Sequence, residues 1–263
     1  MKLKNCFIQL HWLLCTQFGF DPRVMLRSLS GLSRYVRDLV YFRRGYRGRL
    51  YYVPCLQDWS EEGGSTKSEY FWQDLLVARM IFEARPQKHV DVGSRVDGFV
   101  AHVASFRDIE VFDVRKITAQ VPGVIFKQAD LMDPVDGIRD YCDSLSCLHA
   151  LEHFGLGRYG DPVDPQGFER GLINMAALLR ENGVLYLSVP VGVSCVEFNA
   201  QRIVDPRLVV ALAREQRLRL SGFTVIGPGG KVEECGPDAG QLDLLAKQRK
   251  VLVVFVFLKQ NKL

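Results

Sequence analysis

The sequence has no apolar run long enough to cross a membrane. A transmembrane helix needs about 20 consecutive apolar residues, and no stretch of that kind occurs among the 263 residues. The opening residues 1–15 resemble a secretory leader, because Lys2 and Lys4 precede an apolar run. However, Gln9 and His11 interrupt that run, and no small-x-small cleavage site follows it. We therefore expect a cytoplasmic protein, with a peripheral contact to the inner membrane face as an additional expectation.

Paired cysteines are missing as well. The chain has seven cysteines, an odd number, and no C-x-x-C motif. This pattern fits neither a disulfide framework nor a zinc ribbon, and free thiols in a reducing compartment are the simpler interpretation. The contents of 48% hydrophobic and 24% charged residues are ordinary for a globular protein. The length suits one large α/β domain, with or without an extension.

Basic residues are concentrated at the amino-terminal end. Residues 1–50 contain ten Lys or Arg and two acids, so this segment carries +8 and the other 213 residues carry −4. Apolar residues recur here at steps of four and three, which predicts an amphipathic helix. Gly31 within the pattern argues against one unbroken helix. The apolar positions are Met25, Leu29, Leu32, Val36 and Leu39.

The basic residues 23–49 allow several interpretations. The helix could pack on the main domain with a solvated basic face, lie on an anionic membrane surface, or bind an acidic protein. Nucleic acid is the weakest candidate, because basic residues alone supply only non-specific attraction and no recognisable nucleic-acid module accompanies them. We therefore predict no specific nucleic-acid partner.

Strand and helix patterns alternate through the rest of the chain. This alternation predicts a mostly parallel sheet with helices on both faces, preceded by a helical extension. The predicted boundaries are 1–54 for the extension and 55–263 for the α/β domain. Strands are predicted at 88–93, 109–114, 124–130, 184–192, 223–228 and 250–260, and residues 142–153 are predicted to form a strand that runs into a loop or helix. Helices are predicted at 70–86, 99–106, 167–183 and 205–219.

A glycine-containing turn follows the first predicted strand. Asp91, Gly93 and Ser94 form this turn, and Gly98 comes soon after. Glycine allows a ligand to approach the backbone closely, and the start of the next helix offers free N–H groups. Arg95 stands where a second glycine would complete a dinucleotide-binding motif, so NAD(P) is the second choice of cofactor.

Acids end the next two strands. In an open parallel sheet, ligands bind outside the carboxyl ends of the strands. Asp113 could accept hydrogen bonds from both hydroxyls of a ribose, and Asp130 could accept one from the amino group of an adenine. Together with the turn at Asp91, they predict a site for a nucleoside-bearing cofactor.

These motifs resemble class I S-adenosylmethionine-dependent methyltransferases over about residues 70–260. The resemblance implies a Rossmann-like methyltransferase fold and S-adenosylmethionine as cofactor. It also implies that the turn binds the methionine part, Asp113 the ribose, and Asp130 with Leu131 the adenine. More narrowly, the stretches 70–81, 91–106 and 148–168 are similar to the family catalogued as domain of unknown function 268, which accompanies bacterial surface-polysaccharide genes. That similarity implies a glycan or small-molecule acceptor.

The motif H-x-x-E-H occurs at His149, Glu152 and His153, and it has three interpretations. The first is a zinc site of a hydrolase, which needs a helix and a downstream ligand such as Glu233 or Glu234. Glycines directly after the motif argue against that helix. The second is a structural role, in which these side chains bond to neighbouring loops. The third is an active-site rim, where one histidine is the general base and Glu152 orients it.

The loop after this motif supplies candidate acceptor contacts. Arg158, Tyr159, Asp161 and Asp164 lie in it, and two prolines stiffen it. The two acids could bind acceptor hydroxyls or a divalent metal ion, although no metal is predicted; a plain turn is the alternative. The expected function is methyl transfer to a sugar hydroxyl. The alternative is a non-catalytic module that docks on glycan-assembly enzymes or on the membrane.

Overall fold

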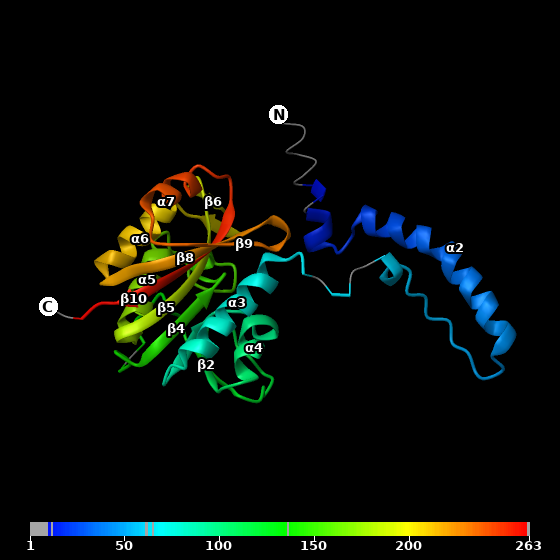
Figure 1. Cartoon of the computed structure of the whole chain (residues 1–263), viewed down its shortest axis with the longest axis horizontal. Coiled ribbons are helices and arrows are strands. Elements are labelled where there is room, and N and C mark those ends of the chain that lie inside the picture. Colours follow the sequence, from blue (N-terminus) through cyan, green and yellow to red (C-terminus); the bar gives the residue numbers. More distant parts are fainter. Residues whose placement is uncertain (1–9, 12, 61–62, 65, 136, 262–263) are drawn as a thin grey trace. The chain divides into compact units, whose positions relative to one another are not determined.

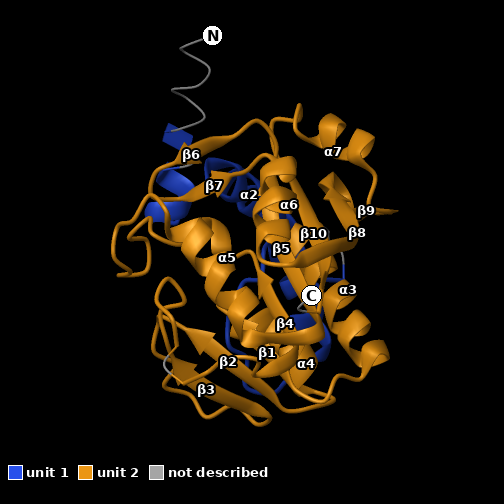
Figure 2. Ribbon diagram, turned by 90° about the vertical axis from the view of Figure 1, so that its left-hand side faces the viewer, with its two compact units in different colours: residues 1–65 blue, residues 66–263 orange. Residues whose placement is uncertain are grey.

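A computed structural model describes residues 10–11, 13–60, 63–64, 66–135 and 137–261. The chain forms two compact units, residues 1–65 and residues 66–263 (Figures 1 and 2). The leader-like pattern, with Lys2, Lys4 and Cys6, lies largely outside the described residues. Within them, no helix combines the length and the apolar character that a membrane span requires.

The first unit is built around one long helix, α2 (Pro22–Gly45). Asp21 caps its start by accepting a hydrogen bond from the Arg23 amide at 2.8 Å. The helix continues through Gly31, so the expectation of a break there is wrong. A Cβ at Gly31 would lie 2.1 Å from the Leu56 carbonyl oxygen, so glycine is needed for this close approach. A short 3₁₀ turn, η1 (Asp58–Ser60), follows.

The second unit contains an eight-stranded sheet in the order β3-β2-β1-β4-β5-β10-β8-β9. Neighbouring strands from β3 to β5 are parallel, whereas β10 runs antiparallel to both β5 and β8. The strands are β1 (His89–Val92), β2 (Ile109–Asp113), β3 (Val124–Gln128), β4 (Cys142–Leu148), β5 (Leu179–Val191), β8 (Leu218–Gly227), β9 (Lys231–Cys235) and β10 (Val251–Lys259). A separate pair consists of β6 (Cys195–Glu197) and β7 (Gln201–Ile203).

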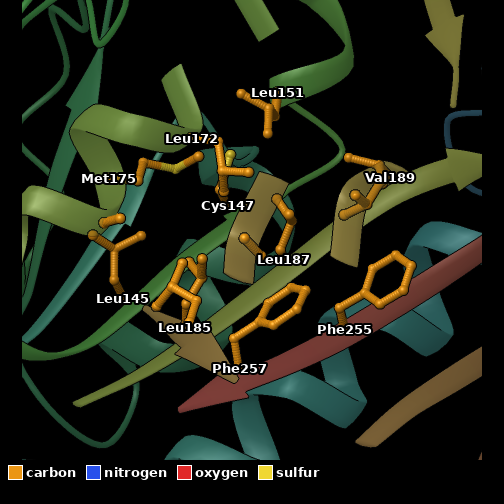
Figure 3. Close-up of a cluster of buried hydrophobic side chains, with 14 of the residues drawn as sticks. Leu145, Cys147, Leu151, Leu172, Met175, Leu185, Leu187, Val189, Phe255 and Phe257 are labelled. Carbon is orange, nitrogen blue, oxygen red and sulfur yellow. The ribbon is translucent and has the colours of Figure 1, made fainter. Parts of the chain in front are cut away.

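Helices cover both faces of this sheet, which confirms the predicted α/β architecture. One face packs against α5 (Gly167–Leu178), α6 (Pro206–Glu215) and α7 (Ala239–Leu245). The other packs against α3 (Glu69–Ala84), the π-turn η2 (Val96–Val100) and α4 (Ala101–Ala104). Because side chains of a strand alternate between faces, Leu185 and Leu187 join the first core and Tyr186 joins the second. Figure 3 shows part of the first core, where leucines of β4 and β5 meet α5 and the phenylalanines of β10.

The predicted helix 167–183 is too long. Helix α5 ends at Leu178, and β5 already begins at Leu179. The amides of Asp140 and Tyr141 donate to the carbonyls of Ala177 and Leu178 at 3.0 and 2.7 Å, so a neighbouring segment satisfies these last carbonyls. The apolar pattern of residues 167–183 could not reveal that amides outside the helix take its last carbonyl groups.

Other predicted boundaries also shift. The helix expected at 99–106 is a π-turn followed by the single turn of α4, and the helix expected at 205–219 ends at Glu215. Strand β3 ends at Gln128, two residues before Asp130. In α3, Leu75 and Phe82 are exposed, whereas Val77, Ala78 and Ile81 are buried. Strands β6, β7 and β9 and helix α7 have no counterpart in the sequence prediction.

Candidate active site

A cavity opens at the carboxyl ends of β1, β2 and β4, beside the segment that follows β3. It encloses about 740 Å³, part of it open to solvent. Its position is the one expected for a ligand site in a parallel sheet. The lining residues are Tyr70, Val92, Gly93, Arg95, Phe112–Arg115, Ala129–Met132, His149, Ala150, His153, Phe154, Arg158, Tyr159 and Asp161.

Asp91 shapes the first turn from behind the cavity wall. Its carboxylate accepts hydrogen bonds from the Ser94 amide and hydroxyl at 3.0 and 2.6 Å and from the Ser146 hydroxyl at 2.6 Å. Complete burial raises the pKa of Asp91 to about 6, although these hydrogen bonds oppose that rise. Asp91 and Ser94 therefore fix the turn and are both outside the cavity lining.

Gly93 brings the turn close to the cavity. Its φ is +72°, and a Cβ there would lie 2.9 Å from the Cβ of Ala150, which follows the neighbouring strand β4. Any side chain would narrow the cavity at this point, so the turn is suited to the methionine part of a cofactor. Gly98 lies outside the lining, and a Cβ there would meet the Asp74 carboxylate at 2.5 Å.

Asp113 lies where the ribose of a cofactor is expected, but Arg115 already binds it. The Asp113 carboxylate accepts from the Arg115 amide, Nε and Nη2 at 2.7, 3.0 and 2.6 Å. The same guanidinium lies 4.4 Å from the centre of the Tyr159 ring. Ribose hydroxyls must therefore share the carboxylate with Arg115 or displace it.

The segment after β3 forms the wall beside Asp113. Asp130 accepts from the Met132 amide at 2.9 Å, and Leu131 and Met132 are buried. Together with Phe112 of β2, they offer an apolar surface with one carboxylate, which fits a flat purine base. The residues present are thus compatible with the cofactor that the sequence predicts.

His149 also lines the cavity, and it lies between two carboxylates. Its Nδ1 is 2.5 Å from Oε1 of Glu152, and its Nε2 is 3.6 Å from Oε1 of Glu69. Burial disfavours the charged imidazole, but the two carboxylates outweigh it and raise the pKa of His149 to about 9. Tyr70 packs its ring on this imidazole, with centroids 4.5 Å apart. His149 is therefore a buried cation at neutral pH.

His153 has a different environment. Its Nδ1 lies 2.7 Å from the carbonyl oxygen of Ala200, which can only accept, so Nδ1 carries the proton and Nε2 is left as an acceptor. Burial lowers the pKa of His153 and the charge of Arg158 adds to this effect, while the Glu152 carboxylate, 3.7 Å from Nε2, opposes it without reversing it. The neutral imidazole is thus the stable form, held by the loop between β6 and β7.

Buried polar contacts hold the loop 154–165 beside the two histidines. Asp161 accepts from the amides of Gly155, Gly157 and Tyr159 at 3.0–3.2 Å, although it also lines the cavity. Arg202, 8% exposed, donates to the Phe154 carbonyl at 2.5 Å and reaches three further carbonyls of this region at 3.3–3.4 Å. Hydrogen bonds to Asp161 and Arg202 therefore hold the conformation of this loop.

Asp164 lies outside the cavity lining. It accepts from the Gln166 amide at 2.8 Å and pairs with Arg170 at 3.0 Å at the start of α5. These contacts give it a structural role, which was the plain-turn alternative for this residue. Of the four candidate acceptor contacts, Arg158, Tyr159 and Asp161 line the cavity.

The zinc interpretation requires a helix that carries both histidines. The structure has only the 3₁₀ turn η3 (Leu151–His153), and Gly155 and Gly157 follow with φ of +74° and +68°. His149 precedes the turn, with its own φ at +54°. Among the described residues, the group with three candidate metal-ligand atoms within 4.8 Å is His11, Cys15 and Asp21, in the first unit. The H-x-x-E-H motif thus forms a charge cluster rather than a zinc-binding helix.

Several residues of the site were missed in the sequence. Glu69 and Tyr70 begin α3, far from the H-x-x-E-H motif in the sequence. Arg115 lies two residues after Asp113, and the strand-end pattern pointed to Asp113 alone. Ala200 acts through its carbonyl oxygen, which no side-chain pattern can reveal. Arg202 is a buried arginine whose carbonyl partners lie 37–50 residues away in the sequence, so only the folded chain brings them together.

The sheet order, with its one antiparallel strand between β5 and β8, and the cavity at the strand ends define the fold of class I S-adenosylmethionine-dependent methyltransferases. A 1,6-didemethyltoxoflavin N1-methyltransferase of Burkholderia thailandensis, solved with 1,6-didemethyltoxoflavin and S-adenosylhomocysteine bound, has a TM-score of 0.54 at 13% identity, over 92% of each chain. A putative methyltransferase of Haloferax volcanii, in complex with the Trm112 activator, scores 0.50 at 12% identity over 74% of this chain and 92% of that one. A putative sarcosine dimethylglycine methyltransferase of Galdieria sulphuraria scores 0.50 at 12% identity over 72% and 86%.

A sequence family described as "Caenorhabditis protein of unknown function, DUF268" matches residues 124–225. The match spans β3 to β8 and includes the histidine motif, the loop after it and Arg202. It agrees with the narrower resemblance noted above, but its description carries no bacterial polysaccharide context. No curated protein matches the chain.

Proposed function

We propose that this protein transfers a methyl group from S-adenosylmethionine to a hydroxyl oxygen of a sugar, in a surface polysaccharide or its precursor. The observation that carries the proposal is one cavity lined both by Gly93, Asp113 and Asp130 and by the neutral imidazole of His153. The first three fit a nucleoside cofactor, and the imidazole is suited to activating a hydroxyl.

Gly93, Asp113 and Asp130 would hold the cofactor. Gly93 admits the methionine part, Asp113 receives ribose hydroxyls, and Asp130 lies beside the adenine on the apolar surface of Leu131 and Met132. When bound, the cofactor supplies an electrophilic methyl carbon on a sulfonium. The protein mainly has to align the acceptor oxygen with that carbon, because the reaction is a displacement.

His153 is the better candidate for the general base. A base must be unprotonated before the reaction, and His149 already holds its proton because its pKa is about 9. His153 is neutral at pH 7, with Nε2 as its acceptor atom. In the proposed step, the hydroxyl proton moves to Nε2 of His153 while the oxygen forms its bond to the methyl carbon and the bond from sulfur breaks. Glu152 was expected to orient the general base. In the structure its nearest histidine is His149, at 2.5 Å, and not the proposed base His153.

The proposed acceptor contacts lie at the mouth of the cavity. Arg158 and Tyr159 are exposed there, and Arg158 Nη1 donates to the Ala200 carbonyl at 2.8 Å. An aromatic ring beside a guanidinium offers a stacking surface and hydrogen-bond donors, which suits a sugar ring. The sugar and the polysaccharide setting come from the sequence resemblance.

Calorimetric titration with S-adenosylmethionine, together with a turnover assay, separates the two halves of the site. Asp113→Ala should abolish cofactor binding, whereas Asp108→Ala, an exposed acid before the same strand, should not. His153→Gln should keep cofactor binding and stop turnover, and His102→Gln serves as its control. Full binding by Asp113→Ala would contradict the cofactor assignment. Full turnover by His153→Gln would contradict the base.

A second candidate function, a non-catalytic module that docks on glycan-assembly enzymes or the membrane, is favoured by two features. Arg115 occupies the Asp113 carboxylate, and Arg95 replaces a glycine of the first turn. Both would weaken cofactor binding. Mass spectrometry of the denatured, purified protein distinguishes the two candidates. Co-purified S-adenosylmethionine or S-adenosylhomocysteine favours the enzyme. If neither compound is found, even after the protein is incubated with excess cofactor, the module is favoured.

A further inference from the structure

Helix α2 of the first unit has one face that packs within its own unit. Gly31 is buried there against Leu56, while Ser28 accepts a hydrogen bond from the Gln57 amide group at 2.8 Å. Tyr35 and Leu39, at steps of four, continue this partly buried face. This packing sets the rotation of α2 about its own axis relative to residues 56–57. It therefore also determines which residues of the helix point away from that segment.

A second face of α2 is an exposed apolar stripe. It consists of five residues at steps of four, three, four and four, which lie on one side of a helix with 3.6 residues per turn. Each of them is about half exposed. The stripe is Met25 (48%), Leu29 (59%), Leu32 (45%), Val36 (49%) and Val40 (51%).

The remaining face of α2 is basic. At 100° per residue, Arg23, Arg27 and Arg34 fall on the side opposite the apolar stripe, and Arg37 lies between them and the edge of that stripe. The one acid of the helix, Asp38, pairs with Arg34 and Arg37 at 3.5 and 2.9 Å. The arginines still outnumber it, so this face carries net positive charge.

We propose that α2 lies in the plane of an anionic lipid surface, with the apolar stripe in the headgroup region and the arginines on lipid phosphates. A helix with a narrow apolar side, low overall hydrophobicity and an arginine-rich polar side is typical of interfacial binding. Exposed aromatic side chains on the following segment, Tyr51 (71%) and Tyr52 (64%), suit the membrane–water boundary.

The apolar stripe favours a lipid surface over nucleic acid or an acidic protein as the anionic partner of α2. Nucleic acid would attract the arginines but would leave the five apolar residues in water. A folded acidic protein would need a groove matched to the stripe, whereas a bilayer accepts any apolar side chains at that depth. The proposal is independent of the methyltransferase assignment, because it involves only the first unit.

Co-sedimentation of the full chain with lipid vesicles tests this proposal. The probes are vesicles of pure phosphatidylcholine and vesicles with 30% phosphatidylserine added to it. Wild type should pellet with the anionic vesicles only, and 0.5 M NaCl should weaken this binding because salt screens the arginine–phosphate attraction. Wild type that stays in the supernatant with both kinds of vesicle would overturn the proposal.

Two variants separate the contributions of the two faces. Arg27→Gln/Arg34→Gln/Arg37→Gln should bind anionic vesicles about a hundredfold more weakly, since each basic residue contributes roughly a factor of five. Leu29→Asn/Val36→Asn should also lose binding while keeping its circular dichroism spectrum, because both residues are exposed. Leu208→Asn, equally exposed in α6 (45%), is the matched control. Unchanged binding by the Leu29/Val36 variant would show electrostatic adsorption alone and would contradict an embedded stripe.

Discussion

His149→Gln tests the buried charge cluster that distinguishes the two histidines. In the folded protein, burial opposes the imidazolium, but Glu152 and Glu69 raise the pKa of His149 from 6.5 to about 9. Glutamine keeps a polar side chain of similar size at a position that is 9% exposed. It removes the titration, and with it the attraction between the imidazolium and the two carboxylates.

The expected magnitude follows from the difference between the two pKa values. Each pKa unit corresponds to about 1.4 kcal/mol, so protonated His149 contributes roughly 3 kcal/mol to the free energy of unfolding. Because the folded pKa is the higher one, this contribution is complete below pH 6.5. It is lost as the pH rises through 9, and by about pH 10 almost none of it should remain.

Urea denaturation of wild type and His149→Gln, followed by circular dichroism between pH 6 and pH 10, measures the contribution. Other titrating groups are common to both proteins and cancel in the difference between their free energies of unfolding. This difference should shrink by roughly 3 kcal/mol across the range. A difference that stays constant with pH would refute a protonated His149, and the argument that leaves His153 as the base would fail with it.

The remaining predictions concern the turn, the loop, the core and the base. Gly93→Ala should cost about 1–3 kcal/mol of stability and weaken cofactor binding, because its φ is +72°; calorimetry and denaturation measure both. Arg202→Ala should cost at least about 2 kcal/mol, since buried carbonyls lose their donor, and should sensitise the adjoining loop to proteolysis. Leu187→Ala should cost about 2–5 kcal/mol, whereas Leu75→Ala, 47% exposed, should stay within about 0.5 kcal/mol. If His153 is the base, turnover should fall as the pH is lowered, with a midpoint below pH 6.5, because burial lowers its pKa.

The fold could be predicted from the sequence because each buried strand has a local signature in its own residues. Buried strands such as 184–192 are continuous apolar runs, and acids mark the ends of β2 and of the segment after β3. The ends of α5 and α6 could not be predicted in the same way. They depend on contacts with distant segments, as when residues 140–141 take the last carbonyls of α5.

The site could be predicted in its location but less well in its roles. Asp91 and Asp113 both follow the strand-end rule, yet one is enclosed by serine hydroxyls and the other is bound to Arg115. The two histidines lie four residues apart and are chemically opposite, because Glu69 reaches one and the Ala200 carbonyl reaches the other. Such differences arise from residues that are remote in sequence.

A crystal structure of the protein with saturating S-adenosylhomocysteine tests the central claim most directly. The proposed function predicts density at the carboxyl ends of β1, β2 and β4, with the ribose hydroxyls on Asp113 and the adenine beside Leu131. Density at another place, or an empty cavity in crystals grown at a concentration where calorimetry shows saturation, would contradict it.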